Sequence, residues 1–447
     1  MCSQIVEDFI KQTQFTKESV YSEFLGWVPY KNLKNLKFIG SGGFSKIYKA
    51  TLEKNSINYE EIFETKEIEV VLKVLNDSQN VDTEFIKELK YIYQFGGFNT
   101  VQCYGVTQIP KSKNYAFILD YAKDGDLHHF LNKNFAEITW REKTGFLMNI
   151  VEGIKKIHDE KILHRDLHSG NILIIDGYNG RDAVISDLGF SQPATIKPNL
   201  SRKSQIYGII PYMAPELFKG QPYSYSSDIY SLGMIMWELT SGHRPFHDQD
   251  HGPKLILDIL DGKRPEITED TPKCWANLMK RCWHSDPSQR LSLDEIYELL
   301  KKFNNYHCFS ESYVKKHYPD IWLEFNEAEK KLLEMVKSKK PFVKNPGYVH
   351  PNSRYYSTLI NPMLESINST ISDLFSNDHF DIMEVNSNQI NKNSEDNSSA
   401  ENSKKTFFRR RTKNLLGDLF NSANVPNNEL CQVENARTTQ LNALNEY

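Results

Sequence analysis

The chain has 447 residues, 39% of them hydrophobic, and a net charge of −4, which is typical of a globular protein and gives no reason to expect nucleic acid as a general partner. Its six cysteines are scattered without CxxC pairs, so we expect neither a disulfide framework nor a zinc site. No signal-peptide pattern and no apolar run long enough to span a bilayer is found, and we therefore expect a cytoplasmic protein, with nuclear entry left open.

The first part of the chain is predicted to be rich in strands. Residues 1–32 form an N-terminal extension, and strand patterns follow from residue 36 to residue 119. One helix interrupts them over residues 82–93, with three apolar side chains on one face: Phe85, Leu89 and Ile92. The acidic stretch 54–65 is interpreted as a surface loop between two strands.

After residue 120 the pattern becomes helical and stays so to about residue 303. Apolar residues at helical spacing predict a helix around residues 147–157. Residues 229–239 are apolar nearly all round, which marks a buried helix.

The last third of the chain is predicted to be an extension followed by a tail. Apolar residues recur at helical spacing within residues 304–345 and predict one more helix there: Ile321, Phe325, Ala328, Leu332 and Val336. The tail, residues 346–447, is rich in Asn and Ser and is expected to be largely disordered. Its basic segment 404–413 is a candidate for contact with an anionic surface, an acidic protein or a nuclear import receptor, or is only a solvated charge run.

A glycine-rich segment lies between two predicted strands and contains Gly40, Gly42 and Gly43. Glycines in such a turn let the backbone close over phosphate groups, although a simple hairpin turn explains them equally well. A dinucleotide-binding motif would need a helix directly afterwards, whereas residues 46–49 read as strand.

A lysine stands inside an apolar predicted strand, at Lys73. Burying its charge requires a partner, and Glu88 on the following helix is the natural one. Such a Lys–Glu pair suits the binding of ATP phosphates. The alternative is an edge-strand lysine whose ammonium group reaches solvent.

Three polar residues then follow in an order that suits phosphoryl transfer. Asp166 lies in His164-Arg165-Asp166, Asn171 comes soon after it, and Asp187 opens Asp187-Leu188-Gly189. The transfer needs a base directed at the attacking hydroxyl and oxygen ligands for Mg²⁺. Asp166 suits the first task, and Asn171 and Asp187 suit the second.

Three further charged residues are predicted to be structural. Glu216, in Ala214-Pro215-Glu216, is expected to pair with Arg290 as a buried ion pair. Asp228, at the start of the buried helix, is expected to cap that helix and to accept hydrogen bonds from the backbone around Asp166.

With these motifs the chain resembles the eukaryotic protein kinases over residues 33–303, and most of all the tyrosine-kinase-like group of serine/threonine kinases. The segments 212–216 and 231–238 look like that group. The resemblance implies an α+β bilobal fold with a strand-rich N-lobe, residues 33–119, and a helical C-lobe, residues 123–303. It also implies transfer of the γ-phosphoryl group of ATP, with Mg²⁺, to Ser or Thr hydroxyls of protein substrates.

The resemblance also implies a set of site residues. The catalytic group comprises Asp166, Lys73, Glu88 and His168, and the Mg²⁺ ligands are Asn171 and Asp187. Glycine-loop and hinge backbone contacts to the nucleotide are expected from Gly40, Gly42, Gly43, Asp120 and Ala122. The adenine ring is expected between Ile39, Ile47, Val71 and Leu173, and the ribose near Asp126.

Several departures from the family pattern leave alternatives open. His168 stands where serine/threonine kinases usually have a lysine, and it either carries positive charge near the moving phosphate or only packs in the loop. Ser45 replaces the third glycine of the phosphate loop, and Ile209 replaces a threonine near the acceptor. Dual-specificity or tyrosine kinase activity, and a weakly active or pseudokinase scaffold, are the alternatives to a serine/threonine kinase. Phosphorylation between Asp187 and Glu216, at one of Thr195, Ser201, Ser204 and Tyr207, is expected to create a partner for Arg165 and to order the loop. The alternative is a loop that is ordered without modification.

Overall fold

The computed structural model describes residues 4–15, 25–41, 45–57, 63–79, 83–177, 180–194, 205–308 and 310–376. The chain divides into two compact units, one of residues 1–251 and 259–361 and the other of residues 252–258 and 362–447. The larger unit holds every site residue predicted above.

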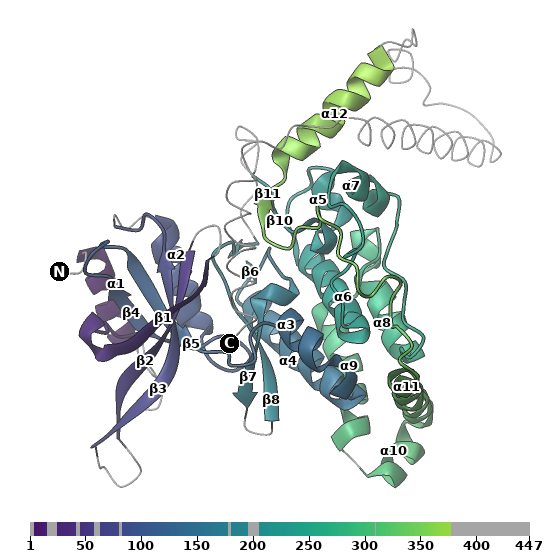
Figure 1. Cartoon of the computed structure of the whole chain (residues 1–447), viewed down its shortest axis with the longest axis horizontal. Coiled ribbons are helices and arrows are strands. Elements are labelled where there is room, and N and C mark those ends of the chain that lie inside the picture. The colour runs from purple at the N-terminus through teal and green to yellow at the C-terminus, as the bar shows by residue number, and fades with distance from the viewer. Residues whose placement is uncertain are drawn as a thin grey trace. The chain divides into compact units, whose positions relative to one another are not determined.

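The N-lobe is a five-stranded antiparallel sheet in the order β1-β2-β3-β5-β4, covered by helix α2 (Figure 1). The elements are β1 (Leu33–Ser41), β2 (Ser45–Ile57), β3 (Phe63–Leu75), α2 (Thr83–Phe95), β4 (Cys103–Gln108) and β5 (Tyr115–Asp120). Side chains alternate between the two faces of the sheet, and both faces are apolar where β5 crosses. One face packs Val70 and Leu72 of β3 against Ile118 of β5.

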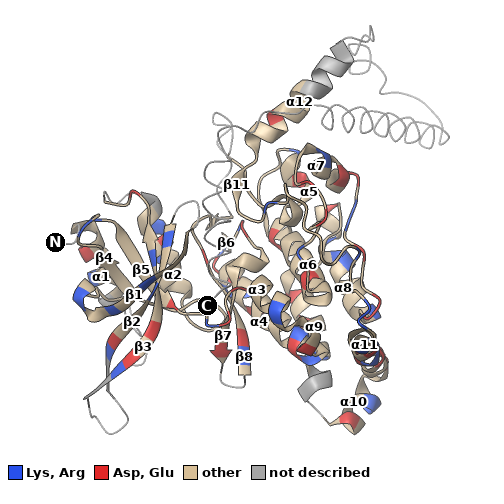
Figure 2. Cartoon of the chain, in the orientation of Figure 1, with Lys and Arg blue, Asp and Glu red and all other residues tan. Residues whose placement is uncertain are grey.

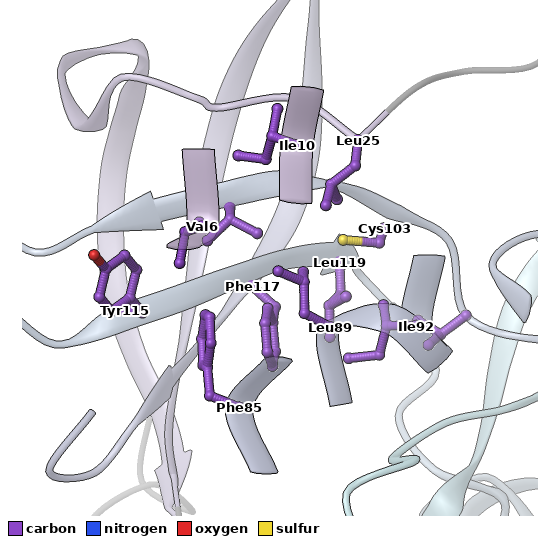
Figure 3. Packing of buried hydrophobic residues seen from close by; sticks show 12 residues of the cluster. Val6, Ile10, Leu25, Phe85, Leu89, Ile92, Cys103, Tyr115, Phe117 and Leu119 are labelled. Carbon is purple, nitrogen blue, oxygen red and sulfur yellow. The ribbon is translucent and has the colours of Figure 1, made fainter. Parts of the chain in front are cut away.

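The opposite face of the sheet packs against α2 and the N-terminal extension (Figure 3). Phe117 stacks on Phe85, with 5.3 Å between the ring centroids, and Leu89 and Ile92 complete the buried face of α2 as predicted. Helix α1 (Gln4–Phe15) adds Val6 and Ile10 to the same cluster. The extension is therefore part of the N-lobe core.

The chain after α1 joins the sheet at a position that requires glycine. Val106 donates its N–H to the carbonyl of Gly26 at 3.0 Å, next to Gly105, whose φ is +150°. A Cβ added at Gly105 would lie 2.5 Å from the Gly26 carbonyl oxygen. Any larger residue would push the extension away from β4.

The β2–β3 hairpin is longer than expected. Its pairing runs without a break from Ser45↔Leu75 to Ile57↔Phe63, so most of the predicted loop 54–65 is strand. The backbone ladder satisfies its polar groups whatever the side-chain charge. Lysines and glutamates both lie along the two strands, as the blue and red parts of the hairpin show (Figure 2). Lys49 of β2 pairs with Glu69 of β3 at 2.5 Å.

The C-lobe is helical, as predicted. Its principal helices are α3 (Leu127–Asn134), α4 (Trp140–Asp159), α5 (Pro215–Phe218), α6 (Tyr225–Ser241), α8 (Lys273–Cys282) and α9 (Leu293–Cys308). The short strands of this lobe are β6 (Ile162–Leu163), β7 (Ile172–Gly177), β8 (Gly180–Ile185) and β9 (Gln192–Pro193). Its 3-10 turns are η2 (Phe135–Glu137), η3 (Ser169–Asn171), η4 (Ile210–Tyr212) and η5 (Pro287–Gln289), whereas η1 (Tyr30–Asn32) directly precedes β1. Helix α7 (Pro253–Leu260) contributes residues to both units.

Helix α6 is the predicted buried helix, but Asp228 does not cap it. The cap is Ser224, whose side chain accepts from the backbone N–H of Ser227. In return, the Ser227 hydroxyl oxygen accepts from the backbone N–H of Ser224. Asp228 lies one turn too far along the helix for capping, and its carboxylate is used elsewhere, as described below.

The predicted extension helix packs on the C-lobe and is preceded by a short helix that was not predicted. These are α10 (Glu311–His317) and α11 (Pro319–Ser338). Phe325 of α11 is fully buried, with its ring centroid 6.0 Å from that of Trp140 and 5.5 Å from that of Phe303. The extension is thus a structural part of the C-lobe.

After α11 the chain does not leave the larger unit. It continues along the C-lobe to β11 (Thr358–Leu359), which pairs antiparallel with β10 (Tyr207–Gly208) (Figure 1). Helix α12 (Asn361–Ser376) follows and belongs, from Pro362 on, to the second unit. We expected the whole stretch 346–447 to be mostly disordered, but the structure places residues 346–376. The rest, with the basic segment 404–413, lies outside the described residues.

In the part of the chain that the structure describes, we find no helix that combines the length and the apolar character needed to cross a bilayer.

Candidate active site

Lys73 of β3 forms ion pairs with two carboxylates from distant parts of the chain. Its Nζ lies 2.8 Å from Oε1 of Glu88 on α2 and 2.8 Å from Oδ1 of Asp187, which follows β8. Alternation along β3 directs Val70, Leu72 and Val74 into one core and Lys73 to the other face. The predicted pair with Glu88 is confirmed, and the second pair with Asp187 was not predicted.

The charges of these three groups are set by burial and by one another. Burial lowers the pKa of Lys73, but the two carboxylates outweigh it and raise the net value above the usual range. Burial, together with the charge of Asp187, raises the pKa of Glu88 above its usual value despite the lowering effect of Lys73. At Asp187 the opposite holds: burial would raise the pKa, but the lysine charge and hydrogen bond hold it below its usual value. The lysine is therefore protonated, and Asp187 is its principal counter-charge.

Asp166 and Asn171 lie together in the loop between β6 and β7. Asp166 is buried, and the side-chain Nδ2 of Asn171 donates to its backbone carbonyl at 2.9 Å. The backbone N–H of Ser186 donates to the carbonyl of Asn171 at 2.9 Å, which ties the segment containing Asp187 to the same loop. The three predicted residues are thus brought together.

Asp228, on α6, fixes the backbone of this loop through hydrogen bonds to its carboxylate. Its carboxylate accepts from the backbone N–H groups of His164 at 2.9 Å and Arg165 at 3.0 Å, as predicted, and from Nε2 of His158 at 2.9 Å. Burial alone would raise the pKa of Asp228, but the hydrogen bond and charge of His158 lower it below the usual value. His158 was missed because it appears in the sequence only as one polar position near the end of a helix.

His168 supports the local backbone of the loop. Its Nδ1 accepts from the N–H of Gly170 at 3.1 Å, where the ring caps the turn η3. Nε2 lies 3.7 Å from Oδ2 of Asp166. The geometry supplies a packing and capping role directly, and a charged role at the moving phosphate stays a prediction.

Several of the residues expected to contact the nucleotide lie on strands beside Lys73. Ile47 of β2 pairs with Lys73, and Val71 pairs with Leu119 of β5. Ile39 of β1 is 46% exposed, as an apolar side chain facing an open ligand site would be. Leu173 packs against the N-lobe cluster. Gly40 lies in β1, whereas Gly42 and Gly43 lie outside the described residues.

Asp120, Ala122 and Asp126 have structural partners in addition to their predicted ligand contacts. The Asp120 carboxylate accepts from the N–H of Gln102 at 2.9 Å and from the Tyr104 hydroxyl at 2.7 Å. The carbonyl of Ala122 accepts from Gly125 N–H at 3.1 Å. Asp126 caps α3 by accepting from His129 N–H at 2.9 Å. These bonds fix the segment between the lobes and leave the hinge and ribose contacts as predictions.

The oxygen ligands available suit Mg²⁺ held jointly with phosphates. The described residues contain no cluster of three His, Cys, Asp or Glu side chains able to hold a metal alone. Mg²⁺ is commonly bound by one or two carboxylates, with substrate phosphates and waters completing its octahedron. Asp187 and Asn171 provide such an incomplete set.

The predicted ion pair of Glu216 and Arg290 is confirmed. Nη1 and Nη2 of Arg290 lie 2.6 and 2.7 Å from the two carboxylate oxygens, and Arg290 also donates to the carbonyls of His284 and Ser226. Arg165, the expected phosphate partner, stacks over the ring of Tyr223 at 4.2 Å, and its buried Nε has no hydrogen-bond partner among the described residues. Thr195, Ser201 and Ser204 lie outside those residues, while Tyr207 lies in β10.

One residue at the site has no counterpart in the sequence analysis. The hydroxyl of Ser357 donates to Asp166, with Oγ 2.7 and 2.6 Å from the two carboxylate oxygens. The two residues are 191 positions apart. Ser357 lies in the stretch that we expected to be disordered, and no periodicity or motif marks it.

Comparisons with known proteins agree with the geometry. A family model described as "protein tyrosine and serine/threonine kinase" matches residues 33–300. A Dictyostelium discoideum protein named "probable serine/threonine-protein kinase" is 30% identical over 282 residues, 60% of this chain and 15% of that protein. Human mitogen-activated protein kinase kinase kinase 7 is 26% identical over 286 residues, 62% of this chain and 43% of that protein. The chain thus spans less than half the length of these relatives.

Proposed function

The chain belongs to the protein tyrosine and serine/threonine kinase family, and from that membership and the site geometry we propose that it transfers the γ-phosphoryl group of ATP to serine and threonine hydroxyls of proteins. The observation that carries the proposal is the position of Asp166. A serine hydroxyl already lies within hydrogen-bond reach of its carboxylate, which is the distance that a general base requires.

Each residue of the site has a task in this reaction. Asp166 orients the attacking hydroxyl and accepts its proton. Lys73, fixed by Glu88, binds the nucleotide phosphates electrostatically. Asp187 and Asn171 would hold Mg²⁺, which when bound neutralises phosphate charge. The unbroken Lys73–Glu88 and Asp187 arrangement argues against an inert scaffold.

The preference for serine and threonine rests on the depth of the site and on the relatives. The hydroxyl that reaches Asp166 in this structure belongs to a serine, with the backbone of its own segment paired to β10. A tyrosine hydroxyl extends several ångströms further from its backbone, so the same backbone path would place it past the carboxylate. Of the two relatives described above, the Dictyostelium discoideum protein carries a serine/threonine-protein kinase name.

The test is phosphoamino-acid analysis after incubation of the pure protein with Mg-ATP and degenerate Ser, Thr and Tyr peptides. We expect phosphoserine and phosphothreonine. The Asp187→Asn variant, which keeps the size of the side chain, should lose transfer by roughly 100-fold or more while its thermal unfolding stays cooperative. Mostly phosphotyrosine would overturn the acceptor assignment, and a fully active Asp187→Asn protein would overturn the site.

A further inference from the structure

Residues 345–360, here called the tail segment, follow the C-lobe and end at the catalytic residue Asp166. The segment is a thin yellow-green trace in Figure 1 that passes along the helical lobe to β11. At its end the Ser357 hydroxyl donates to both oxygens of Asp166, at 2.7 and 2.6 Å. This is the position that the proposed mechanism gives to a substrate hydroxyl.

The backbone around Ser357 is bound as an added β-strand. Tyr207 and Gly208 of β10 pair with Leu359 and Thr358 of β11, and the N–H of Ile360 donates to the carbonyl of Ile206 at 2.8 Å. Binding of an extended peptide at a free strand edge is a common mode of peptide recognition. Because β10 lies just before Ala214-Pro215-Glu216, the strand pairing holds Ser357 in register with the catalytic loop.

Upstream, the tail segment is attached by backbone bonds and one aromatic anchor. The Tyr355 ring lies 4.8 Å from His251 and 4.7 Å from the guanidinium of Arg244, and its hydroxyl donates to the carbonyl of Pro245 at 3.0 Å. The N–H of Arg354 donates to Nδ1 of His251 at 2.9 Å. Neighbouring side chains remain open to solvent, including Val349 at 63% and Tyr356 at 50% exposed.

Apart from Ile360, which is buried, the segment is attached as a bound peptide would be, through its backbone and one aromatic side chain. We propose that Ser357 is an intramolecular phosphoacceptor of this kinase, and that the tail segment occupies the protein-substrate site until Ser357 is phosphorylated. The proposal rests on the kinase activity proposed above.

The reaction needs no reagent beyond ATP. A bond forms between Ser357 Oγ and the γ-phosphorus, and the bond from that phosphorus to the oxygen bridging the β- and γ-phosphates breaks. ADP leaves with the electron pair of the broken bond, and the hydroxyl proton passes to the Asp166 carboxylate. No atom is oxidised or reduced.

The product should not remain where the substrate lay. Phosphoserine carries a charge of about −1.5 to −2 at neutral pH, and a phosphate beside a carboxylate is repelled. The Asp166 contact is thereby lost, and with it the only tie from the Ser357 side chain to the catalytic loop among the described residues. The β10–β11 pairing, the buried Ile360, the Tyr355 anchor and the backbone bonds to His251 continue to hold the flanking parts of the segment. Phosphorylation therefore opens the site to other proteins.

The test measures phosphorylation of Ser357 and of an added peptide in the same reaction, using the full chain and Mg-ATP. We expect phospho-Ser357 by mass spectrometry, formed at a rate per molecule that changes less than about twofold over a 30-fold dilution, since the step is intramolecular. In a mixture of an active Ser357→Ala chain with an Asp187→Asn chain, the intact Ser357 of the latter should stay unmodified. Peptide phosphorylation by the wild type should show a lag that follows phospho-Ser357.

Variants separate the proposal from its alternatives. Ser357→Asp should remove the lag and raise the initial peptide rate roughly tenfold, as expected if the open form is about a tenth of the starting population. Ser353→Ala, in the same segment, removes a hydroxyl that among the described residues bonds only to the carbonyl of His350; it is the matched control and should behave as the wild type. Peptide phosphorylation without phospho-Ser357, or a Ser357→Asp protein no faster than the wild type, would overturn the proposal and leave the kinase activity standing. No transfer to either acceptor would overturn both.

Discussion

Two ionic clusters of the described residues differ in how completely their charges are satisfied. One is the pair of Arg290 with Glu216, and the other is Lys73 with its two carboxylates, Asp187 and Glu88. Arg290 has no exposed side-chain surface, holds both oxygens of Glu216 and uses its other donors on backbone carbonyls. Lys73 is divided between two carboxylates, and Asp187 keeps 38% of its side chain exposed. A closed pair of the first kind fixes a fold, whereas an open one of the second kind can exchange partners with a ligand.

Breaking the closed pair should have the largest effect on stability. Glu216→Ala leaves the buried guanidinium of Arg290 without its counter-charge, which should cost about 3–5 kcal/mol of unfolding free energy. Urea unfolding of the full chain gives the measurement. The double variant Glu216→Leu with Arg290→Met removes both charges and should recover part of the loss; a double variant no more stable than the single one would contradict this account.

Breaking the open pair should affect activity far more than stability. Lys73→Met removes the group that we propose binds phosphate, so kcat/KM should fall by roughly 100-fold or more, about 2.7 kcal/mol of transition-state stabilisation. The unfolding free energy should fall by only about 1 kcal/mol, because Glu88, whose pKa burial already raises, can take up a proton. If Lys73→Met and Glu216→Ala lowered the unfolding free energy equally, the Lys73 cluster would contribute as much to the stability of the fold as the Arg290–Glu216 pair, which would contradict this account.

The pH dependence of stability should reveal a third buried charge, Asp228. Its pKa in the folded protein lies below the unfolded value of about 3.9, so its contribution is present above that pH and is lost as the pH falls through the lower folded value. The difference in unfolding free energy between wild type and Asp228→Asn should therefore be constant near neutrality and shrink below about pH 4. His158→Gln should reduce the same difference, since His158 is the partner that lowers the pKa most.

The smallest effect is expected at His168. If its role is to accept the Gly170 N–H, His168→Asn keeps an acceptor and should retain activity, whereas His168→Ala should lose roughly fivefold, in line with about 1 kcal/mol for a lost cap. Single-turnover rates across neutral pH provide the measurement. A steep pH dependence present in the wild type and absent from His168→Lys would instead support the charged-histidine hypothesis.

The sequence predicted which residues would meet at the site, because phosphoryl transfer constrains residue types and spacing within short motifs. Strand and helix patterns placed Lys73 with Glu88, and motif order placed Asp166 with Asn171 and Asp187. The prediction for Asp228 was correct in one part and wrong in the other. Its bonds to the loop that contains Asp166 are confirmed, but it does not cap α6, because Ser224, four residues earlier, is the cap.

What the sequence could not predict depends on contacts between distant residues. The strands of the β2–β3 hairpin extend through charged residues, because the backbone ladder and cross-strand pairs outweigh low strand propensity. Ser357 reaches Asp166 only because α11, the Tyr355 anchor and the β10–β11 pairing direct the chain there. The polar composition of the tail does not predict these contacts between distant residues.

Helix α11 also determines where this protein can be divided. The family match ends at residue 300, yet the fully buried indole of Trp140 rests against Phe325, which lies beyond that limit. A recombinant fragment cut at the family boundary would expose Trp140 and the neighbouring ring of Trp275, 5.3 Å away, as an apolar patch open to aggregation. The smallest fragment that keeps this patch covered ends after α11, at about residue 340.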